Sequence, residues 1–298
     1  MESIARNGHV GQLLPSGDPN VAPGHLRYEL VGINEASTFA GLCNRHDSEL
    51  FRPIETIPIT FTSEQMFLLG YRALMRECYT KRQAIHQLEF MRSYGDHHPD
   101  IKSPFYENYL SSAELGNRHG QNALLYHKGI YDDVWRNNNF SKIRFVAFLY
   151  DSPTPILSAS AFAPEYDFTG GLLQDLSDLS FTQNSMSLCI WSVDSCGVVL
   201  LMWHETSDRS CVPFVRSLLR QPKPRLSARL TSLAFEHSEN IAFSPYWWEA
   251  LSPSNRLALE RRMKGGLISS EPRQPDYLHD EGCTAISARV NRVLEHFS

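Results

Sequence analysis

Ile143–Tyr150 reads IRFVAFLY, and this run of β-branched and aromatic residues indicates a buried strand. Three similar runs follow it, separated by Pro, Gly, Asp and Ser residues that suit turns. These runs cover residues 156–162, 186–193 and 198–204. Gly197 precedes the last of them and suits a tight hairpin between the last two strands. We therefore predict a central, largely antiparallel sheet of about four strands.

Helical patterns precede this sheet. Thr62 and Gln65 have the spacing of a capping box, which predicts the start of a helix of about 28 residues. Residues 104–136 are expected to be mostly helical as well. Apolar residues recur along the first of these helices at intervals of three, four and seven, and they are Phe67, Tyr71, Leu74, Cys78, Ile85 and Leu88.

Helical patterns also follow the sheet. Residues 212–219, 226–237 and 245–263 each have helical periodicity, and Pro245 suits the first turn of the last one. Residues 286–297 are expected to form a final amphipathic helix. The order of elements is therefore helices, sheet and helices.

The first residues differ from the rest in composition. Gly and Pro are dense in residues 1–29, which predicts an irregular lead-in, and residues 28–33 suit a short strand. The fold class that follows is α+β, with an N-terminal knuckle and helical region, a central antiparallel sheet and C-terminal helices. We expect three regions: residues 1–60 hold the lead-in and the knuckle, 61–140 are helical, and 141–298 hold the sheet and the C-terminal helices. The last two regions could form one domain.

Composition limits the class of protein. The chain has 298 residues, of which 42% are hydrophobic, so it can build a sizeable core. Its formal net charge of -5 argues against a general polyanion binder. Its six cysteines do not have the spacings of a disulfide scaffold, which favours reduced thiols in a cytoplasm. No run approaches the roughly 20 apolar residues that a membrane-spanning helix needs, so we expect no membrane insertion.

The densest group of metal-binding and acid–base side chains lies in residues 39–55, FAGLCNRHDSELFRPIE. Cys43 and His46 have C-x-x-H spacing, which can direct two zinc ligands toward one point. Asp47 follows at once and can cap a short helix. Among residues before this knuckle, only His9 and His25 could add a further imidazole, and His9 is the accessory candidate.

Residues 3–10 (SIARNGHV) and 36–55 (ASTFAGLCNRHDSELFRPIE) together resemble a group of uncharacterised bacterial proteins with an HNH-like, treble-clef zinc knuckle near the N-terminus. The resemblance extends to residues 69–74, 162–176 and 239–251 and so covers most of the chain. Members of that group usually carry further N-terminal residues, with Cys and a His-Thr-Ile-type strand, that complete the zinc finger. This chain begins beyond that region, so the resemblance leaves it with half of the site.

The resemblance implies a bacterial cytosolic protein that is associated with nucleic acid through a partial or degenerate zinc knuckle. It implies Zn as the cofactor, Cys43 and His46 as metal ligands, and His9 and Asp47 as accessory residues. It assigns no catalytic residue, because the general-base His of the HNH class lies in the absent half.

Two alternatives remain open. The first is a metal-free protein-interaction or regulatory module, in which Cys43 is a small packing residue and Asp47 caps a helix. The second is an HD phosphohydrolase, because His46 and Asp47 are adjacent, but its further ligands would have to come from His86, Asp96, His97, His98 and Asp100.

A second locus lies after the strand at residues 156–162. There Glu165 and Asp167 precede Gly170 and Gly171, a turn that could hold a cation or bring bare backbone close to a ligand. The simpler interpretation is a wide loop whose acids face solvent.

Overall fold

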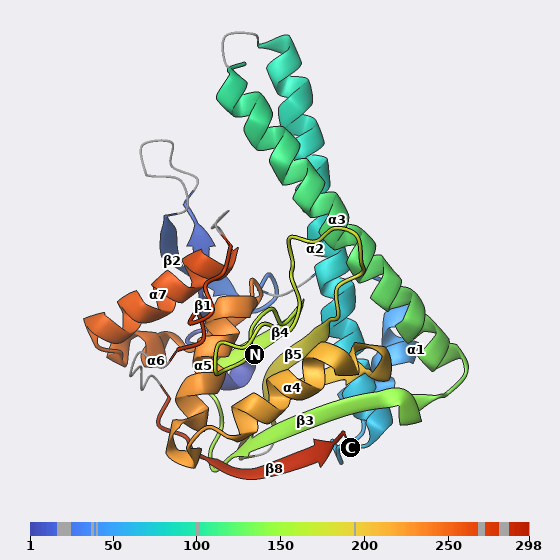
Figure 1. Cartoon of the computed structure of the whole chain (residues 1–298). Coiled ribbons are helices and arrows are strands. Elements are labelled where there is room, and N and C mark those ends of the chain that lie inside the picture. The colour runs from blue at the N-terminus through green and yellow to red at the C-terminus, as the bar shows by residue number, and fades with distance from the viewer. Residues whose placement is uncertain are drawn as a thin grey trace.

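The computed structural model describes residues 1–16, 25–36, 39, 41–98, 102–193, 195–267, 272–279 and 286–297. In this part of the chain, eight strands form one antiparallel sheet in the order β2-β1-β7-β4-β5-β6-β3-β8 (Figure 1). The chain is α+β overall, but the prediction of about four strands is wrong. The expected four are β3 (Ile143–Tyr150), β4 (Ile156–Phe162), β5 (Met186–Val193) and β6 (Cys196–His204). The others are β1 (His9–Pro15), β2 (Leu26–Gly32), β7 (Ile241–Phe243) and β8 (Val290–His296).

Of the additional strands, β2 overlaps the short strand predicted over residues 28–33, and the other three have weak sequence signals. β1 lies in the expected irregular lead-in and contains Gly11 and Pro15, both of which are rare in strands. β7 has only three residues. β8 replaces the expected final helix, and it pairs antiparallel with β3 at the edge of the sheet. An edge strand is half exposed, so its residues need no strict alternation, and here hydrogen bonds to β3 override the helical pattern.

Strands β3 to β6 have a Greek-key order, because β3 lies beside β6 and its connection to β4 crosses the end of the β5–β6 hairpin. Gly197 N donates to Ser152 O at 3.0 Å in this crossing. A Cβ atom at Gly197 would lie 2.8 Å from Thr154 N, so the crossing requires glycine. The β5–β6 pairing also confirms the predicted hairpin, although Asp194 in its turn lies outside the described residues.

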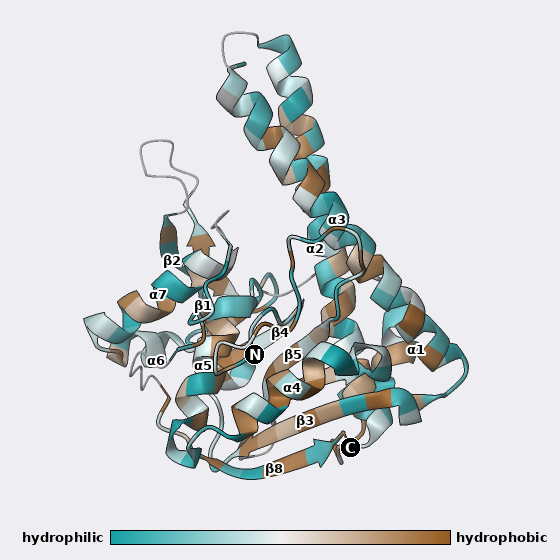
Figure 2. Ribbon diagram, viewed as in Figure 1, coloured by the Kyte–Doolittle hydropathy of each residue, from teal (hydrophilic) through white to brown (hydrophobic). Residues whose placement is uncertain are grey.

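Helices cover both faces of the sheet (Figure 1). On one face α1 (Asn44–Glu55), α2 (Ser63–His97) and α3 (Pro104–Arg136) pack with Phe145, Cys189 and Met202. On the other face α4 (Asp208–Leu219), α5 (Leu226–His237) and α7 (Pro253–Leu267) pack with Phe148 and Trp203. Hydrophobic residues accordingly concentrate on the strands and on the helix sides that face them (Figure 2). Short 3₁₀ turns lie at η1 (Glu2–Ile4), η3 (Phe140–Lys142), η4 (Glu205–Ser207) and η5 (Lys223–Arg225).

The expected single helix over residues 245–263 is two helices. α6 (Pro245–Ala250) ends before Ser252, and α7 begins at Pro253. Proline disfavours helical geometry in the residue before it and cannot donate a backbone hydrogen bond, so Pro253 starts a new helix rather than continuing α6.

The start of α2 confirms the predicted cap. Gln65 N donates to the Thr62 hydroxyl at 3.2 Å. The Gln65 side chain is buried and accepts from Thr60 N at 2.8 Å, while its amide donates to the carbonyls of Pro53 and Pro58. Gln65 therefore ties the end of α1 to the start of α2.

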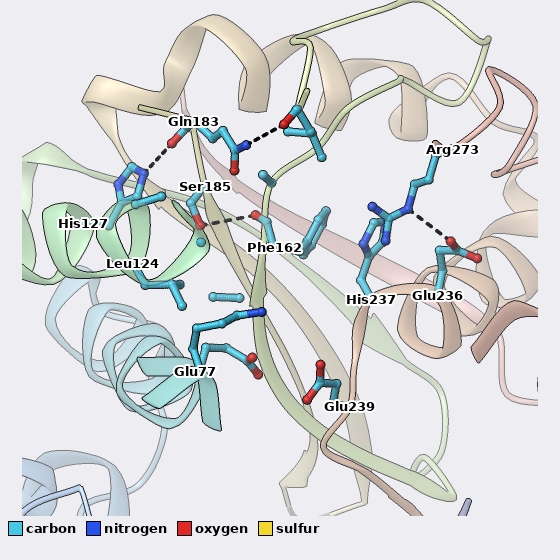
Figure 3. A pocket seen from close by; sticks show the side chains of 16 residues that line it. Glu77, Leu124, His127, Phe162, Gln183, Ser185, Glu236, His237, Glu239 and Arg273 are labelled. Carbon is cyan, nitrogen blue, oxygen red and sulfur yellow. Dashed lines mark hydrogen bonds and ion pairs between the residues drawn. The ribbon is translucent and has the colours of Figure 1, made fainter. Parts of the chain in front are cut away.

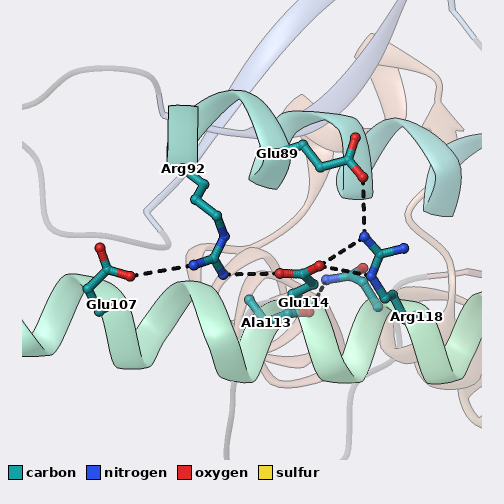
Figure 4. A network of polar contacts seen from close by, with 7 residues as sticks. Glu89, Arg92, Glu107, Ala113, Glu114 and Arg118 are labelled. Carbon is teal, nitrogen blue, oxygen red and sulfur yellow. Dashed lines mark hydrogen bonds and ion pairs between the residues drawn. The ribbon is translucent and has the colours of Figure 1, made fainter. Parts of the chain in front are cut away.

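Helices α2 and α3 pair as a long antiparallel hairpin whose far half stands clear of the sheet (Figure 1). At about 1.5 Å per residue, the 35 residues of α2 extend about 50 Å. We call this far half the arm. Its helices are joined by ion pairs in which Arg92 contacts Glu107 and Glu114, and Arg118 contacts Glu89 and Glu114, at 2.9–3.5 Å (Figure 4). Each exposed pair contributes little alone because water screens it, but the shared partners form one network.

Within the described residues, no helix combines the length and the apolar character that crossing a membrane would need.

Candidate functional site

A cavity of about 200 Å³ lies where α2 and α3 leave the sheet. Its walls come from these helices, the end of β4, the loop 163–185, the end of α5 and the segment 272–279. The cavity is unusual in the number of charged and titratable groups that line it, which Figure 3 shows. These are Glu77, Lys81, His127, Glu236, His237, Glu239 and Arg273.

Glu77 projects from α2 into the cavity and faces Glu239 (Figure 3). Its side chain is 12% exposed, and its carboxyl lies 3.4 Å from the Arg76 guanidinium. Burial and then the negative charge of Glu239 raise the pKa of Glu77 to about 8, against the opposing effects of Arg76 and Lys81. At neutral pH this carboxyl therefore holds its proton and can donate a hydrogen bond.

The end of α5 supplies the opposite wall. His237 is buried, stacks on the Phe162 ring at 4.1 Å between centroids, and has Nε2 3.2 Å from the Tyr277 hydroxyl. Burial and then the nearby Arg273 hold the pKa of His237 well below its usual value, so the ring is neutral. The adjacent Glu236 carboxylate is buried and pairs with Arg273 Nε at 3.3 Å.

A second neutral histidine closes the cavity beside α3. His127 is buried, and its Nε2 donates to Gln183 O at 2.7 Å. Burial lowers the pKa of His127, although this hydrogen bond acts in the other direction. The Gln183 amide in turn donates to Leu176 O at 3.1 Å within the loop 163–185, and the bond from His127 holds this loop against α3 (Figure 3).

These groups differ in protonation state within one small space. Glu77 is a proton donor, Glu239 is a carboxylate, and the two histidines are neutral acceptors or donors. Lys81 and Arg273 can stabilise negative charge that develops on a bound molecule. Such separation of acid and base roles between neighbouring groups is what general acid–base chemistry needs.

The sequence-predicted knuckle lies elsewhere, at the start of α1. Cys43 is the N-cap residue, and its Sγ lies 3.3 Å from His46 Nδ1. Both side chains are exposed. The structure thus brings together the two predicted ligands, Cys43 and His46.

The accessory candidates do not join this pair. Asp47 lies in the first turn of α1 rather than at its cap, and its carboxylate contacts Arg72 at 3.3 Å. The helix begins four residues earlier than a cap at Asp47 would require, because Cys43, with extended backbone geometry, is the N-cap. His9 is the first residue of β1, and its Nδ1 lies 2.9 Å from Asn7 O.

Across the described part of the chain, no three His, Cys, Asp or Glu side chains gather closely enough to hold a metal ion. This includes the ligands considered for an HD phosphohydrolase, except Asp100, which lies outside the described residues. The residues described therefore offer zinc two donors where a structural site needs four.

In the turn after β4, the Asp167 side chain has a structural role. The Asp167 carboxylate accepts from Thr169 N, Thr169 Oγ1 and Gly171 N at 2.7–2.9 Å, so it shapes the turn. Glu165 is buried close to the cavity, and burial raises its pKa.

Sequence reasoning missed Glu77 and the Glu236–His237 pair. Glu77 directly precedes Cys78 in the apolar stripe of α2, and a carboxyl beside such a stripe is the signal that could have identified it. The pair at 236–237 ends a helix whose other residues are all buried, which is a comparable signal.

Comparison with protein-family models, with curated proteins and with solved structures gave no match to this chain. The fold and the cavity are therefore the basis for the functional argument, and the resemblance to the HNH-like group stays a prediction.

The protonation of Glu77 predicts how stability changes with pH. The folded-state pKa of about 8 lies above the ordinary value of 4.5, so between these values the unfolded chain loses a proton that the folded chain keeps. Glu77 therefore makes the protein progressively less stable as pH rises from about 4.5 to about 8. Glu77→Gln should remove this loss, so the variant should gain on the order of 2–4 kcal/mol over the wild type by pH 8 and almost nothing at pH 4.

The measurement is urea unfolding of both proteins across this pH range, with Glu49→Gln as an exposed control. A Glu77→Gln protein that is less stable than the wild type at pH 8 would mean that Glu77 is ionised and stabilised by Arg76.

Proposed function

We propose that the protein binds a small polar molecule in the cavity and that Glu77 donates a proton to it. The observation that carries this proposal is the buried Glu77 carboxyl, whose pKa is raised to about 8 at a cavity wall opposite Glu239. Titratable groups perturbed by burial and by a specific charge, in one cavity, are the physical mark of a functional site.

The energetic cost of Glu77 in the folded protein supports a role for this residue in function rather than in folding. A protonated carboxyl next to a second carboxylate destabilises the folded chain at neutral pH, and a glutamine or an apolar residue at position 77 would not. Proteins keep such unfavourable groups where activity needs them.

The size and lining of the cavity limit the ligand. At about 200 Å³ it is smaller than the roughly 300–1,000 Å³ of sites for drug-sized molecules. Phe162 and Leu124 give one apolar wall, while the charged groups surround the rest. The ligand is therefore a small metabolite with several polar atoms. In this proposal Glu77 acts as general acid: its proton passes to the ligand, and the carboxylate left on Glu77 is stabilised by Arg76 and Lys81.

A thermal-shift panel of small amino acids, amines, carboxylic acids and sugars tests this function. We expect one class to raise the melting temperature of the wild type and to leave Ala163→Leu unchanged, because a leucine at this lining position fills the cavity. Ala113→Leu, on the arm, is the matched control and should respond as the wild type does.

For a compound that binds, calorimetry in two buffers of different ionisation enthalpy gives the proton exchanged on binding. The wild type should exchange a proton near pH 7 that Glu77→Gln does not exchange. Equal stabilisation of Ala163→Leu, or equal proton exchange by Glu77→Gln, would contradict the proposed function.

We propose as a second candidate the function implied by the resemblance, a bacterial cytosolic, nucleic-acid-associated protein with a partial zinc knuckle. The observation that favours it is the 3.3 Å approach of Cys43 Sγ to His46 Nδ1 at an exposed helix start. Two donors in this position suit a site whose remaining ligands come from outside the described residues. The five described cysteines are all free thiols, which suits a reducing cytosol.

Elemental analysis of the purified protein tests the zinc site. If Cys43 is a ligand, Cys43→Ala should lower both the bound zinc and the melting temperature, whereas Cys196→Ala should keep the zinc. Unchanged metal content and melting temperature in Cys43→Ala would exclude the zinc site.

The metal-free interaction module would then be the function to pursue. The arm supports that alternative, because it exposes Phe90 by 68% and Tyr94 by 48%, and their rings stack at 6.3 Å. Exposed aromatic side chains are common anchors in protein interfaces.

A further inference from the structure

A second hollow, which we call the groove, lies on the other side of the Arg76–Glu77 pair from the cavity. It has a volume of about 860 Å³ and lies between the start of α1, the first half of α2 and β4. Its polar lining includes Asn44, Asp47, Ser48, Arg72, Arg76 and Asn240, and its rings are Phe39 and Tyr79. The groove is therefore much larger than the cavity, and its charged lining is two arginines and one carboxylate, whereas the cavity has three carboxyl groups and two cations.

Arg72 and Arg76 lie one helical turn apart on α2 and both line the groove. The Arg72 guanidinium lies over the Phe51 ring at 4.6 Å and contacts Asp47 at 3.3 Å and Glu55 at 2.7 Å. These contacts fix its position and leave some of its five N–H donors available. Two guanidinium groups at this spacing suit a phosphate group.

Arg76 is the more deeply buried of the two cations. Its side chain is only 17% exposed, and the carboxyl within ion-pair distance is that of Glu77, at 3.4 Å. Because the pKa of Glu77 is about 8, this partner is mostly neutral at pH 7. Burial lowers the pKa of Arg76 despite the opposing charge of Glu239, so an anion in the groove would stabilise this cation further.

A smaller hollow beside the groove contains a polar group without a hydrogen-bond partner among the described residues. The Ser158 hydroxyl is buried, its residue being 8% exposed, and it has no hydrogen bond to the rest of the described chain. It lines a smaller hollow of about 230 Å³ that shares Met1, Ala159 and Asn240 with the groove. Buried hydroxyls in native proteins are normally satisfied, so this smaller hollow has a place for a polar partner of Ser158 next to the groove.

The rings supply a surface for a planar group. Phe39 and Tyr79 lie 6.1 Å apart at an angle of 51°, and Tyr79 comes one turn after the Arg76 position on α2. Aromatic side chains that adjoin cations bind ring compounds by stacking.

We propose that the groove binds a small molecule that carries a phosphate group and a planar ring, with Arg72 and Arg76 on the phosphate and Tyr79 against the ring. This site is separate from the cavity and does not depend on the function proposed for it.

Isothermal titration with AMP as the probe tests the proposal, with adenosine and inorganic phosphate as the two half-ligands. AMP should bind the wild type more tightly than either half-ligand. Arg76→Gln should weaken AMP binding at least tenfold, and Tyr79→Ala should reduce the advantage of AMP over inorganic phosphate. Arg45→Gln, an exposed arginine of α1 that does not line the groove, is the matched control and should bind as the wild type does.

Melting curves establish that each variant is folded, and Tyr79→Ala keeps the test decisive if Arg76→Gln does not fold. Ala163→Leu should bind AMP normally, because it fills only the cavity. Absence of saturable AMP binding to the wild type, or wild-type affinity in both Arg76→Gln and Tyr79→Ala, would overturn the proposal. Loss of AMP binding in Ala163→Leu would do so as well, because it would assign the nucleotide to the cavity.

Discussion

The close packing of α2 on the sheet determines where every other feature of this protein lies. A Cβ atom at Gly70 would lie 1.9 Å from Met202 Cε and 3.2 Å from Ser187 Cβ, so a larger residue there would force the buried Met202 side chain to repack and Ser187 or the helix to shift. The Ser187 hydroxyl donates to Gly70 O at 2.9 Å at the same point. Since α2 is long and contains no proline, its position at Gly70 also fixes Arg76 and Glu77 two turns later and the arm beyond them.

This position places the Arg76–Glu77 pair between the cavity and the groove. Glu77 faces the cavity and Arg76 faces the groove, and the two side chains contact each other at 3.4 Å. Because both are mostly buried, the charge of one affects the other strongly. The charge held in the groove would thus influence the proton on Glu77. The two hollows are close enough for such coupling, although each has its own lining and its own suitable ligand chemistry.

The sequence could predict those parts of the fold in which the residue types alone indicate burial or a helix start. IRFVAFLY at Ile143–Tyr150 has few polar residues and lies between β6 and β8, mostly buried, so composition alone identifies it. Thr62 and Gln65 likewise mark the start of α2 by local chemistry. β8 could not be recognised in this way, because its exposed and half-exposed residues do not alternate and fit a helix equally well, and its pairing partner β3 lies about 145 residues earlier in the chain.

The same distinction applies to the candidate site. Cys43 and His46 are three residues apart, so their approach follows from local spacing. Glu77 and Glu239 are 162 residues apart in the chain. They meet only because α2 and the segment after α5 both reach the cavity at the end of β4. No local pattern contains that information. A carboxyl beside an apolar helical stripe was a signal, but its meaning depended on the partner that the tertiary structure supplied.

The central claim is that the Glu77 carboxyl keeps its proton at neutral pH because of burial and the facing Glu239. Carbon-13 NMR of the glutamate side-chain carboxyl groups, assigned by comparison with Glu77→Gln, measures this directly during a pH titration. The account predicts that the Glu77 signal titrates with a pKa of about 8 and that Glu239→Gln lowers this value. Titration of Glu77 near 4.5, as for an ordinary glutamate, would contradict the account.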